Sequence, residues 1–139
     1  MKNLKPKTIE TACMGIPVIY DPAMENPISN CRGIFRWKKI FVGPAFMRFP
    51  PREQAALLIH EVGHCKMFHL EKRILAALAL VFWPPALVRL CNAQEFQADL
   101  FAAHCGYGRD LANAFLRVQS AEPIPLHPPI AERIARLLP

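Results

Sequence analysis

A proline-free stretch from Gln54 to about Arg73 predicts a long helix near the middle of the chain. Pro50-Pro51 precede it, and proline suits the first turn of a helix because its missing N–H would have no partner there. Alanine, leucine, glutamate and lysine dominate the stretch. Its apolar residues recur at intervals of three and four, namely at Ala56, Ile59, Gly63, Met67 and Leu70. The sequence therefore predicts a helix of roughly 20 residues with one side directed at a protein core.

Shorter elements are predicted on both sides of this helix. Before it, residues 16–20 and 33–43 favour strands, separated by a loop over residues 21–30; Lys38-Lys39 allow either a hairpin or one irregular edge strand. After it, helices are expected over about residues 86–104 and 109–120, and from Pro128 onward. The 139 residues thus predict one α+β domain, with three to four helices and a small N-terminal sheet of two or three strands, behind a basic arm over residues 1–14.

The composition limits the classes of function. Hydrophobic residues make up 53% of the chain, which excludes an intrinsically disordered protein. The net charge of +6 could attract an anionic surface, but no base-reading motif accompanies it, so no nucleic-acid partner is expected. Five cysteines at irregular spacings, without a CxxC pair, make a disulfide framework unexpected and indicate a reducing, cytoplasmic compartment. The N-terminus shows no apolar segment of a secretory signal.

Residues 74–88 form a run without a charged side chain. The run is shorter than the about 20 apolar residues that span a bilayer, and Pro84-Pro85 interrupt it. We expect a buried helix end, a turn and the start of a new helix. Two alternatives stay open: a hairpin that contacts a membrane surface through Ala76 to Val88, and a patch that binds a partner. The basic N-terminus slightly favours the membrane contact.

The predicted long helix carries the sequence His60-Glu61-Val62-Gly63-His64. Positions i and i+4 lie on one face of a helix, so the two imidazoles can point at one ion. Zinc prefers such nitrogens in a tetrahedral set, with an open position for water when the site is catalytic. Glu61 can reach that water as general base and then pass the proton to a leaving amine. The alternative is a pair of histidines with structural roles only.

A third ligand is expected from the next helix. Glu95 can supply a carboxylate oxygen, and Asp99, one turn later, can accept the N–H of a ligating histidine and fix its tautomer. Both acids lie among apolar residues, where an unpaired acid would be costly, although an exposed acidic stripe is the alternative. His69 and His104 are not assigned to zinc, because His69 falls on a different helical face from His64 and His104 lies near a helix end.

The segments HEVGH, QEFQADLFAAHCGYGRDLANAFLRV and HPPIAERIARLLP occur in this order along the chain. Together they resemble the HtpX-like and type I CAAX prenyl protease family of zinc metallopeptidases, and the similarity covers about 70% of the chain. The resemblance implies a zincin-like minimal gluzincin fold and one zinc per chain, held by His60, His64 and Glu95. It also implies a zinc endopeptidase that hydrolyses a peptide or unfolded-protein substrate.

The same resemblance implies roles for two residues near the C-terminus. His127 matches a histidine that lies near the metal in this family, where it is proposed to stabilise the oxyanion or to occupy the open coordination position in a latent state. Arg133 matches an arginine that could pair with Glu95 or Asp99, or bind a substrate carbonyl or carboxylate. The family also places an edge strand, to which an extended peptide adds, at residues 39–43.

The sequence departs from this family between His64 and Glu95, which are only 31 residues apart. HtpX-like members carry transmembrane helices there, so a reduced, single-domain version over residues 1–139 is implied. ImmA-like repressor-cleaving proteases also join an HExxH motif to a later acidic helix with FAA, as at residues 101–103, but lack the C-terminal segment. A non-catalytic zinc-binding interaction or inhibitor module is an alternative from a different class, against which the intact Glu61 argues.

Overall fold

The computed structural model describes residues 7–25, 28–79, 83–118 and 126–138, and only the backbone of residues 7–11. Its strands are β1 (Lys7–Cys13), β2 (Ile16–Tyr20), β3 (Ser29–Arg32) and β4 (Lys39–Val42). Its helices are α1 (Pro51–Lys66), α2 (His69–Ala79), α3 (Pro84–His104), α4 (Gly108–Val118) and α5 (Ile130–Leu137), with short 3₁₀ helices η1 (Phe35–Trp37) and η2 (Phe46–Arg48). The predicted α+β class is confirmed, with one more helix and one more strand than expected.

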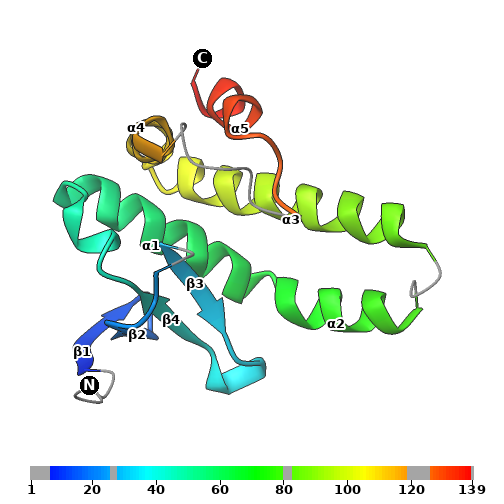
Figure 1. Ribbon diagram of the computed structural model, residues 1–139, viewed down its shortest axis with the longest axis horizontal. Coiled ribbons are helices and arrows are strands. Elements are labelled where there is room, and N and C mark those ends of the chain that lie inside the picture. The colour runs from blue at the N-terminus through cyan, green and yellow to red at the C-terminus, as the bar shows by residue number, and fades with distance from the viewer. Residues whose placement is uncertain (1–6, 26–27, 80–82, 119–125, 139) are drawn as a thin grey trace.

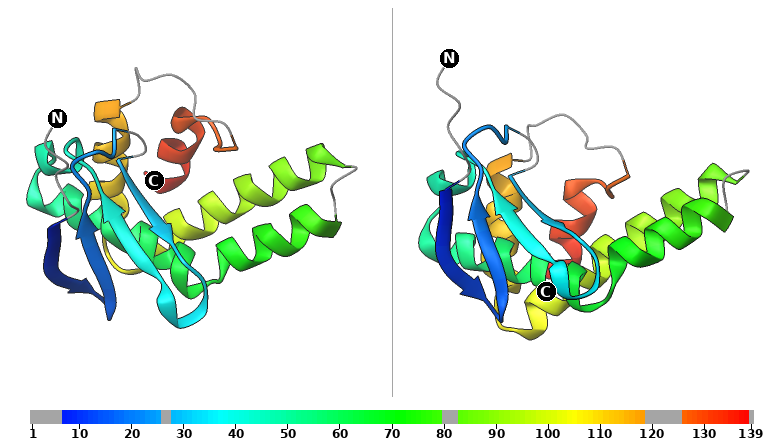
Figure 2. Two further views of the ribbon diagram at one scale, coloured as in Figure 1. Left: turned by 60° about the horizontal axis from the view of Figure 1, so that its bottom comes forward. Right: turned by 90° about the horizontal axis from the view of Figure 1, so that it is seen from below.

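The four strands form one sheet in the order β1-β2-β4-β3 (Figure 1). β1 pairs antiparallel with β2, β2 runs parallel to β4, and β4 pairs antiparallel with β3. The expectation of a basic arm is wrong for residues 7–13, because they form β1; residues 1–6 lie outside the described part. The sheet lies on one side of α1, with α3, α4 and α5 on the opposite side, and α2 extends beyond the end of α1 (Figure 2).

The edge of the sheet beside α1 is β3, not the strand at residues 39–43. β4 lies between β2 and β3, so it has no free edge, and the expected edge strand at these residues is wrong. No strand was expected at residues 29–32, and a loop was expected over residues 21–30. The sequence Ser29-Asn30-Cys31-Arg32 contains no β-branched or aromatic residue, the types that favour strands. Its strand conformation follows from its pairing with β4, which runs from Ser29 opposite Val42 to Arg32 opposite Lys39.

Helix α1 is the centre of the core. It packs against β3 on one side and against α3 and α4 on the other. Gly63 permits the close approach of α3, because a Cβ there would lie 3.2 Å from Ala98 Cα and 3.3 Å from Phe101. A fully buried set of apolar residues fills the space between the layers: Ile40, Val42, Ala56, Val62, Ala102 and Leu111. The same packing brings the second half of α1 against the middle of α3.

The predicted long helix is divided in two at Met67-Phe68. α1 ends at Lys66 and α2 begins at His69. Phe68 has φ = 56°, a left-handed conformation that costs a residue with a side chain about 1–3 kcal/mol. The break redirects the chain, so that His69 packs against His64 instead of lying on a different face of one continuous helix.

Helix α2 and the first half of α3 form a hairpin that extends beyond the sheet (Figure 2). Its apolar side chains were expected to be buried, but Ile74, Leu75, Leu78 and Trp83 are exposed, because no element within the described residues covers this end of the hairpin. Residues 80–82 lie outside the described part. Among the helices that the structure describes, none is both long and apolar enough to cross a membrane.

A disulfide joins Cys31 in β3 to Cys65 near the end of α1. This contradicts the expectation from cysteine spacing, because the two residues are 34 positions apart in sequence and meet only through the packing of β3 on α1. Cys13, Cys91 and Cys105 are free thiols. The disulfide therefore fixes the edge strand to the helix that carries the HEVGH sequence.

Candidate metal centre

The three predicted ligands meet at the contact between α1 and α3. One donor atom from each of His60, His64 and Glu95 lies within 4.8 Å of the other two. His60 Nε2 is 3.1 Å from His64 Nε2 and 3.5 Å from Glu95 Oε2, and His64 Nε2 is 3.4 Å from Glu95 Oε1. All three side chains are mostly or completely shielded from solvent.

These separations fit a tetrahedral metal. Ligands at about 2.0–2.1 Å from zinc, arranged tetrahedrally, lie about 3.3 Å from one another. Two imidazole nitrogens and a carboxylate are also the donor types that zinc prefers. Glu95 is only 1% exposed, and its Oε2 accepts no hydrogen bond from the residues that the structure describes. The cluster therefore fits a bound cation better than it fits a purely structural network.

Asp99 orients the first histidine. Its Oδ1 lies 2.9 Å from His60 Nδ1, and a carboxylate this close favours the tautomer with the proton at Nδ1 and the lone pair at Nε2, the atom near His64 and Glu95. Arg133 from α5 binds Asp99 with two hydrogen bonds, of 2.8 Å from Nε and 2.6 Å from Nη2. This pairing was one of the predicted roles of Arg133. The guanidinium is buried, and its Nη1 also lies 3.5 Å from Glu95 Oε2, so Arg133 is paired with both acids.

Glu95 is surrounded by cationic and imidazole groups. Burial alone would raise the pKa of its carboxyl, but its contacts with His60 and His64 outweigh burial and hold the pKa well below its usual range. Arg73 Nη2 donates a 2.9 Å hydrogen bond to Glu95 Oε1. Arg73 was not predicted as a site residue, since it lies beyond the helix break, on α2. Glu95 is thus ionised, as a metal ligand must be.

His69 is the residue that the sequence analysis placed wrongly. It is 1% exposed, its Nδ1 lies 2.8 Å from His64 Nδ1, and its Nε2 lies 3.1 Å from Gln97 Oε1. Burial and the neighbouring His64 lower the pKa of His69 to about 4, so its ring is neutral. Because Gln97 Oε1 only accepts, Nε2 of His69 carries the proton, and its Nδ1 accepts an N–H from His64 Nδ1. This leaves the lone pair of His64 at Nε2, where it faces His60 and Glu95.

Replacing His69 is therefore expected to weaken zinc binding without removing a ligand. We expect His69→Leu to lower zinc affinity about 10–100-fold, the usual effect of losing a group that orients a metal ligand. His69→Gln should retain part of the affinity, because its amide oxygen can accept the N–H of His64. Competition with a chromophoric chelator measures both, and exposed His104→Leu is the matched control. Zinc binding by His69→Leu as tight as that of the parent chain would contradict this role.

Glu61 projects from the next position of α1 and is not among the three ligands. It is mostly buried, and the hydroxyl of Ser29 donates a 3.0 Å hydrogen bond to its Oε1. Ser29 lies in the edge strand β3, which the sequence analysis did not identify as an element. A hydrogen bond from a neighbouring strand thus fixes the carboxylate beside the two histidines.

His127 lies close to the cluster, as the sequence resemblance implied. Its Nε2 is 3.4 Å from Glu95 Oε1, and its side chain is 31% exposed. Burial lowers its pKa, although the nearby Glu95 opposes this. His127 directly precedes Pro128, which is buried, and Pro129 at the start of α5. The structure thus brings together all seven predicted site residues: His60, Glu61, His64, Glu95, Asp99, His127 and Arg133.

The stability of the zinc-free protein should fall as pH rises from about 6.5 to 9. Burial lowers the pKa of His60, but contacts with Asp99 and Glu95 outweigh burial and raise it to about 9, from about 6.5 when unfolded. A raised pKa stabilises the fold fully below the unfolded value, and this contribution disappears as pH passes the folded value.

Urea unfolding at a series of pH values, in the presence of a chelator, measures the effect. Zinc binding should strengthen over the same range, since the metal needs His60 without its second proton. His104→Gln, at an exposed histidine, should keep the parent profile. Constant or rising stability of the zinc-free protein between pH 6.5 and 9 would contradict the assignment to His60.

No protein-family model matches the sequence, and no curated protein is similar enough to count as a relative. One similar solved structure is a crystal structure of S. mikatae Ste24p, with a TM-score of 0.70 and 17% sequence identity. The match covers 96% of this chain and 51% of that chain, so this chain spans about half the length of the structure it matches. At this identity the match establishes a shared fold: this chain has the fold of about half of Ste24p.

Proposed function

We propose that this protein is a zinc-dependent endopeptidase. The observation that carries the proposal is the tetrahedral spacing of the His60, His64 and Glu95 donors, with the buried carboxylate of Glu61 next to them on the same helix. This chain has the fold of about half of Ste24p, a zinc metalloprotease, and this likeness loosely supports hydrolysis without indicating a substrate.

The residues of the chain have separate parts in this reaction. A bound zinc would polarise the scissile carbonyl and lower the pKa of its water to about 7. Glu61 accepts the proton of the attacking water and donates it to the leaving amine, while Ser29 holds its carboxylate in place. Asp99 and His69 keep His60 and His64 in the tautomers that present Nε2 to the metal. Arg133 binds Asp99 and so fixes α5 to the site.

The substrate is an extended peptide or an unfolded segment that pairs with β3. Among the described residues β3 has a strand on one side only, toward β4. A peptide added to its free side would gain backbone hydrogen bonds with little selection for sequence. Since Ser29 of β3 contacts Glu61, such a peptide would run past the catalytic carboxylate. This assigns to β3 the role that the sequence resemblance gave to residues 39–43.

His127→Ala is expected to lower the rate of hydrolysis. The imidazole lies beside Glu95, on a segment held by Pro128-Pro129, where it can donate a hydrogen bond to a carbonyl oxygen that gains negative charge. Losing one such donor costs about 10²–10³-fold in kcat. His104→Ala is the control. An increased rate would mean that His127 blocks the site in a latent state, and an unchanged rate and zinc affinity would mean that it is structural.

Hydrolysis of an unfolded protein by the zinc-loaded chain tests the proposal. We expect fragments from a reduced, alkylated protein substrate, complete loss of cleavage in a chelator, and recovery after one equivalent of zinc is added. A chain that binds one zinc but cleaves no unfolded protein would instead support a non-catalytic zinc-binding module.

A further inference from the structure

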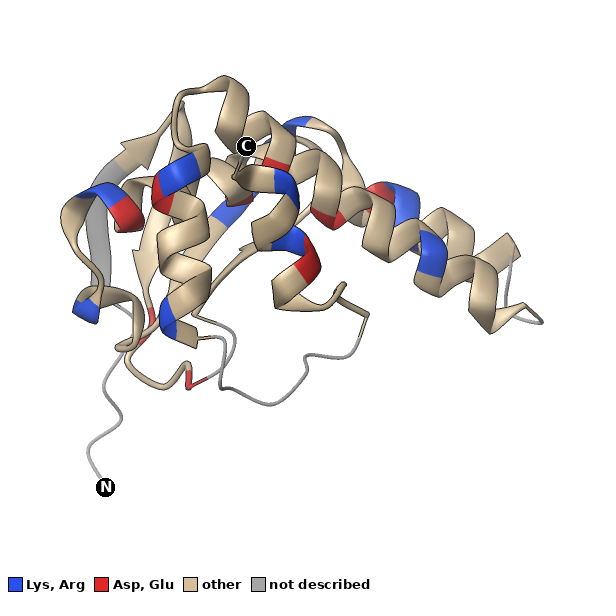
Figure 3. Ribbon diagram, turned by 90° about the horizontal axis from the view of Figure 1, so that it is seen from above, with Lys and Arg blue, Asp and Glu red and all other residues tan. Residues whose placement is uncertain are grey.

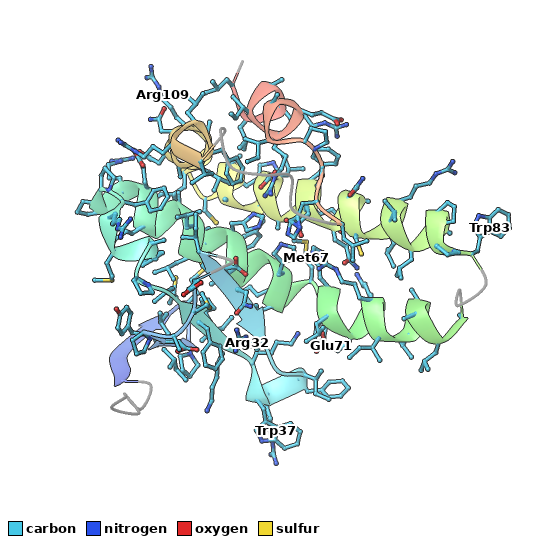
Figure 4. The ribbon with its side chains drawn as sticks, in the orientation of Figure 1. Arg32, Trp37, Met67, Glu71, Trp83 and Arg109 are labelled. Carbon is cyan, nitrogen blue, oxygen red and sulfur yellow. A yellow bond between two sulfur atoms is a disulfide. The ribbon has the colours of Figure 1, made fainter. Side chains whose placement is uncertain are left out.

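Six of the large apolar side chains that are exposed in this chain lie on the α2–α3 hairpin and on η1 beside it. The hairpin surface consists of six large side chains, each at least about half exposed: Phe35, Trp37, Phe68, Leu75, Leu78 and Trp83. Leu75 and Leu78 are 67% and 76% exposed, and Trp37 and Trp83 are 61% and 65% exposed. Figure 4 shows the two tryptophans pointing away from the body, one at η1 and one at the tip of the hairpin. An exposed apolar surface of this kind marks an interaction site.

The spacing along α2 places this surface on one helical face. Glu71, Leu75 and Leu78 follow at intervals of four and three residues, which align them on one side of α2. Phe68, just before α2, lies near them, because Lys38, the partner of Glu71, is 4.0 Å from the centre of its ring. η1 adjoins the same side, because the backbone N–H of Phe35 donates a 2.9 Å hydrogen bond to Glu71 Oε1. Glu71 is also paired with the buried Lys38 at 2.8 Å. The one acid on this face is therefore neutralised, and the face as a whole is apolar.

The residues around the surface are basic. Arg36, Lys39, Lys72 and Arg89 flank it and are exposed. In the sequence of residues 34–41 and 66–90, seven Lys and Arg stand against a single acid, Glu71. The end of the hairpin carries neither basic nor acidic residues (Figure 3). Apolar and tryptophan side chains surrounded by Lys and Arg are typical of segments that lie in the interface of a membrane with anionic lipids.

We propose that this hairpin surface docks the protein on the surface of an anionic lipid bilayer. The leucines and tryptophans insert to the level of the headgroups, and the surrounding cations contact lipid phosphates. The contact is peripheral, because α2 has only 11 residues and no described helix could cross the bilayer. A second copy of the chain fits this surface less well, because its own basic residues would lie opposite those of the first copy. The inference does not depend on the proposed peptidase function.

Tryptophan fluorescence tests this directly, because the chain has only two tryptophans and both belong to the hairpin surface. We expect vesicles of phosphatidylcholine and phosphatidylglycerol to shift the emission to shorter wavelength and to co-sediment with the protein. Vesicles of phosphatidylcholine alone should bind less, and high salt should weaken the binding by screening the charges. Zinc-loaded Glu61→Gln protein suits the measurement, since docking requires no hydrolysis.

Two double variants separate the apolar and the electrostatic parts. Lys72→Glu with Arg89→Glu should weaken binding to anionic vesicles about 25-fold or more, because each basic side chain near an anionic surface contributes about a factor of five. Leu75→Ser with Leu78→Ser should abolish the fluorescence shift. Arg109→Glu with Leu116→Ser on α4 is the matched control, since both residues are exposed and Arg109 lies on the far side of the molecule (Figure 4). Circular dichroism checks that each variant is folded.

Three results would overturn the proposal. They are no binding to anionic vesicles, equal binding by the hairpin variants and the α4 control, and a concentration-dependent dimer that the hairpin variants disrupt while vesicles bind no protein. The last result would assign the hairpin surface to a second copy of the chain.

Discussion

Glu61→Gln should leave zinc bound and the fold intact but reduce peptide hydrolysis by about 10²–10⁴-fold, the usual contribution of a general base. Glu61 is not one of the three ligands, and glutamine keeps the size of the side chain and the hydrogen bond from Ser29, which an amide oxygen can still accept. The amide cannot take a proton from water. Steady-state cleavage of an unfolded protein and metal analysis of the same samples measure both parts of the prediction.

Two further variants sharpen this test. Ser29→Ala should lower the rate less than Glu61→Gln, because it removes the group that holds the base and not the base itself. Glu132→Gln, at an exposed acid in α5, should keep the parent rate of hydrolysis, because it removes only the ion pair with Arg136. If Glu61→Gln hydrolyses substrate at the parent rate, the mechanism is wrong. If neither the parent chain nor Glu61→Gln hydrolyses any substrate while both bind zinc, the chain is a binding module.

His60→Ala should reduce bound zinc from about one per chain to nearly none at micromolar metal. The substitution removes the imidazole that supplies a ligand nitrogen and leaves Asp99 with Arg133 as its remaining partner. Hydrolysis should disappear with the metal. Metal analysis after gel filtration measures the loss, and exposed His104→Ala should keep full zinc. Stoichiometric zinc in His60→Ala would mean that the ligand set is wrong.

The sequence was sufficient to predict the two helices that carry the ligands and the residues that meet between them. The i, i+4 spacing of His60 and His64 is a local property of a helix and needs no tertiary information. Glu95 and Asp99 could be identified because acids among apolar residues need partners. The structure brings the His60, His64 and Glu95 donors together, and among the roles open to Arg133 it shows the pairing with Asp99.

The features that the sequence could not predict depend on tertiary contacts. The break at Phe68 uses a left-handed conformation that no glycine signals, and it alone brings His69 to His64. β3 has no residue pattern typical of a strand. The sequence therefore predicts neither its pairing with β4 nor the hydrogen bond from Ser29 to Glu61. The Cys31–Cys65 disulfide depends on the same packing. The exposure of residues 74–79 follows from the absence of any covering element among the described residues, which an apolar sequence does not reveal.

Anomalous diffraction at the zinc edge, from crystals of the zinc-loaded protein, locates the metal and its ligands. We expect one strong peak per chain, about 2.0–2.2 Å from His60 Nε2, His64 Nε2 and a carboxylate oxygen of Glu95, with Glu61 near the open position of the metal and not bound to it. A peak that uses His69 or a cysteine in place of any of these three ligands, or no peak from protein that retains stoichiometric zinc, would contradict this expectation.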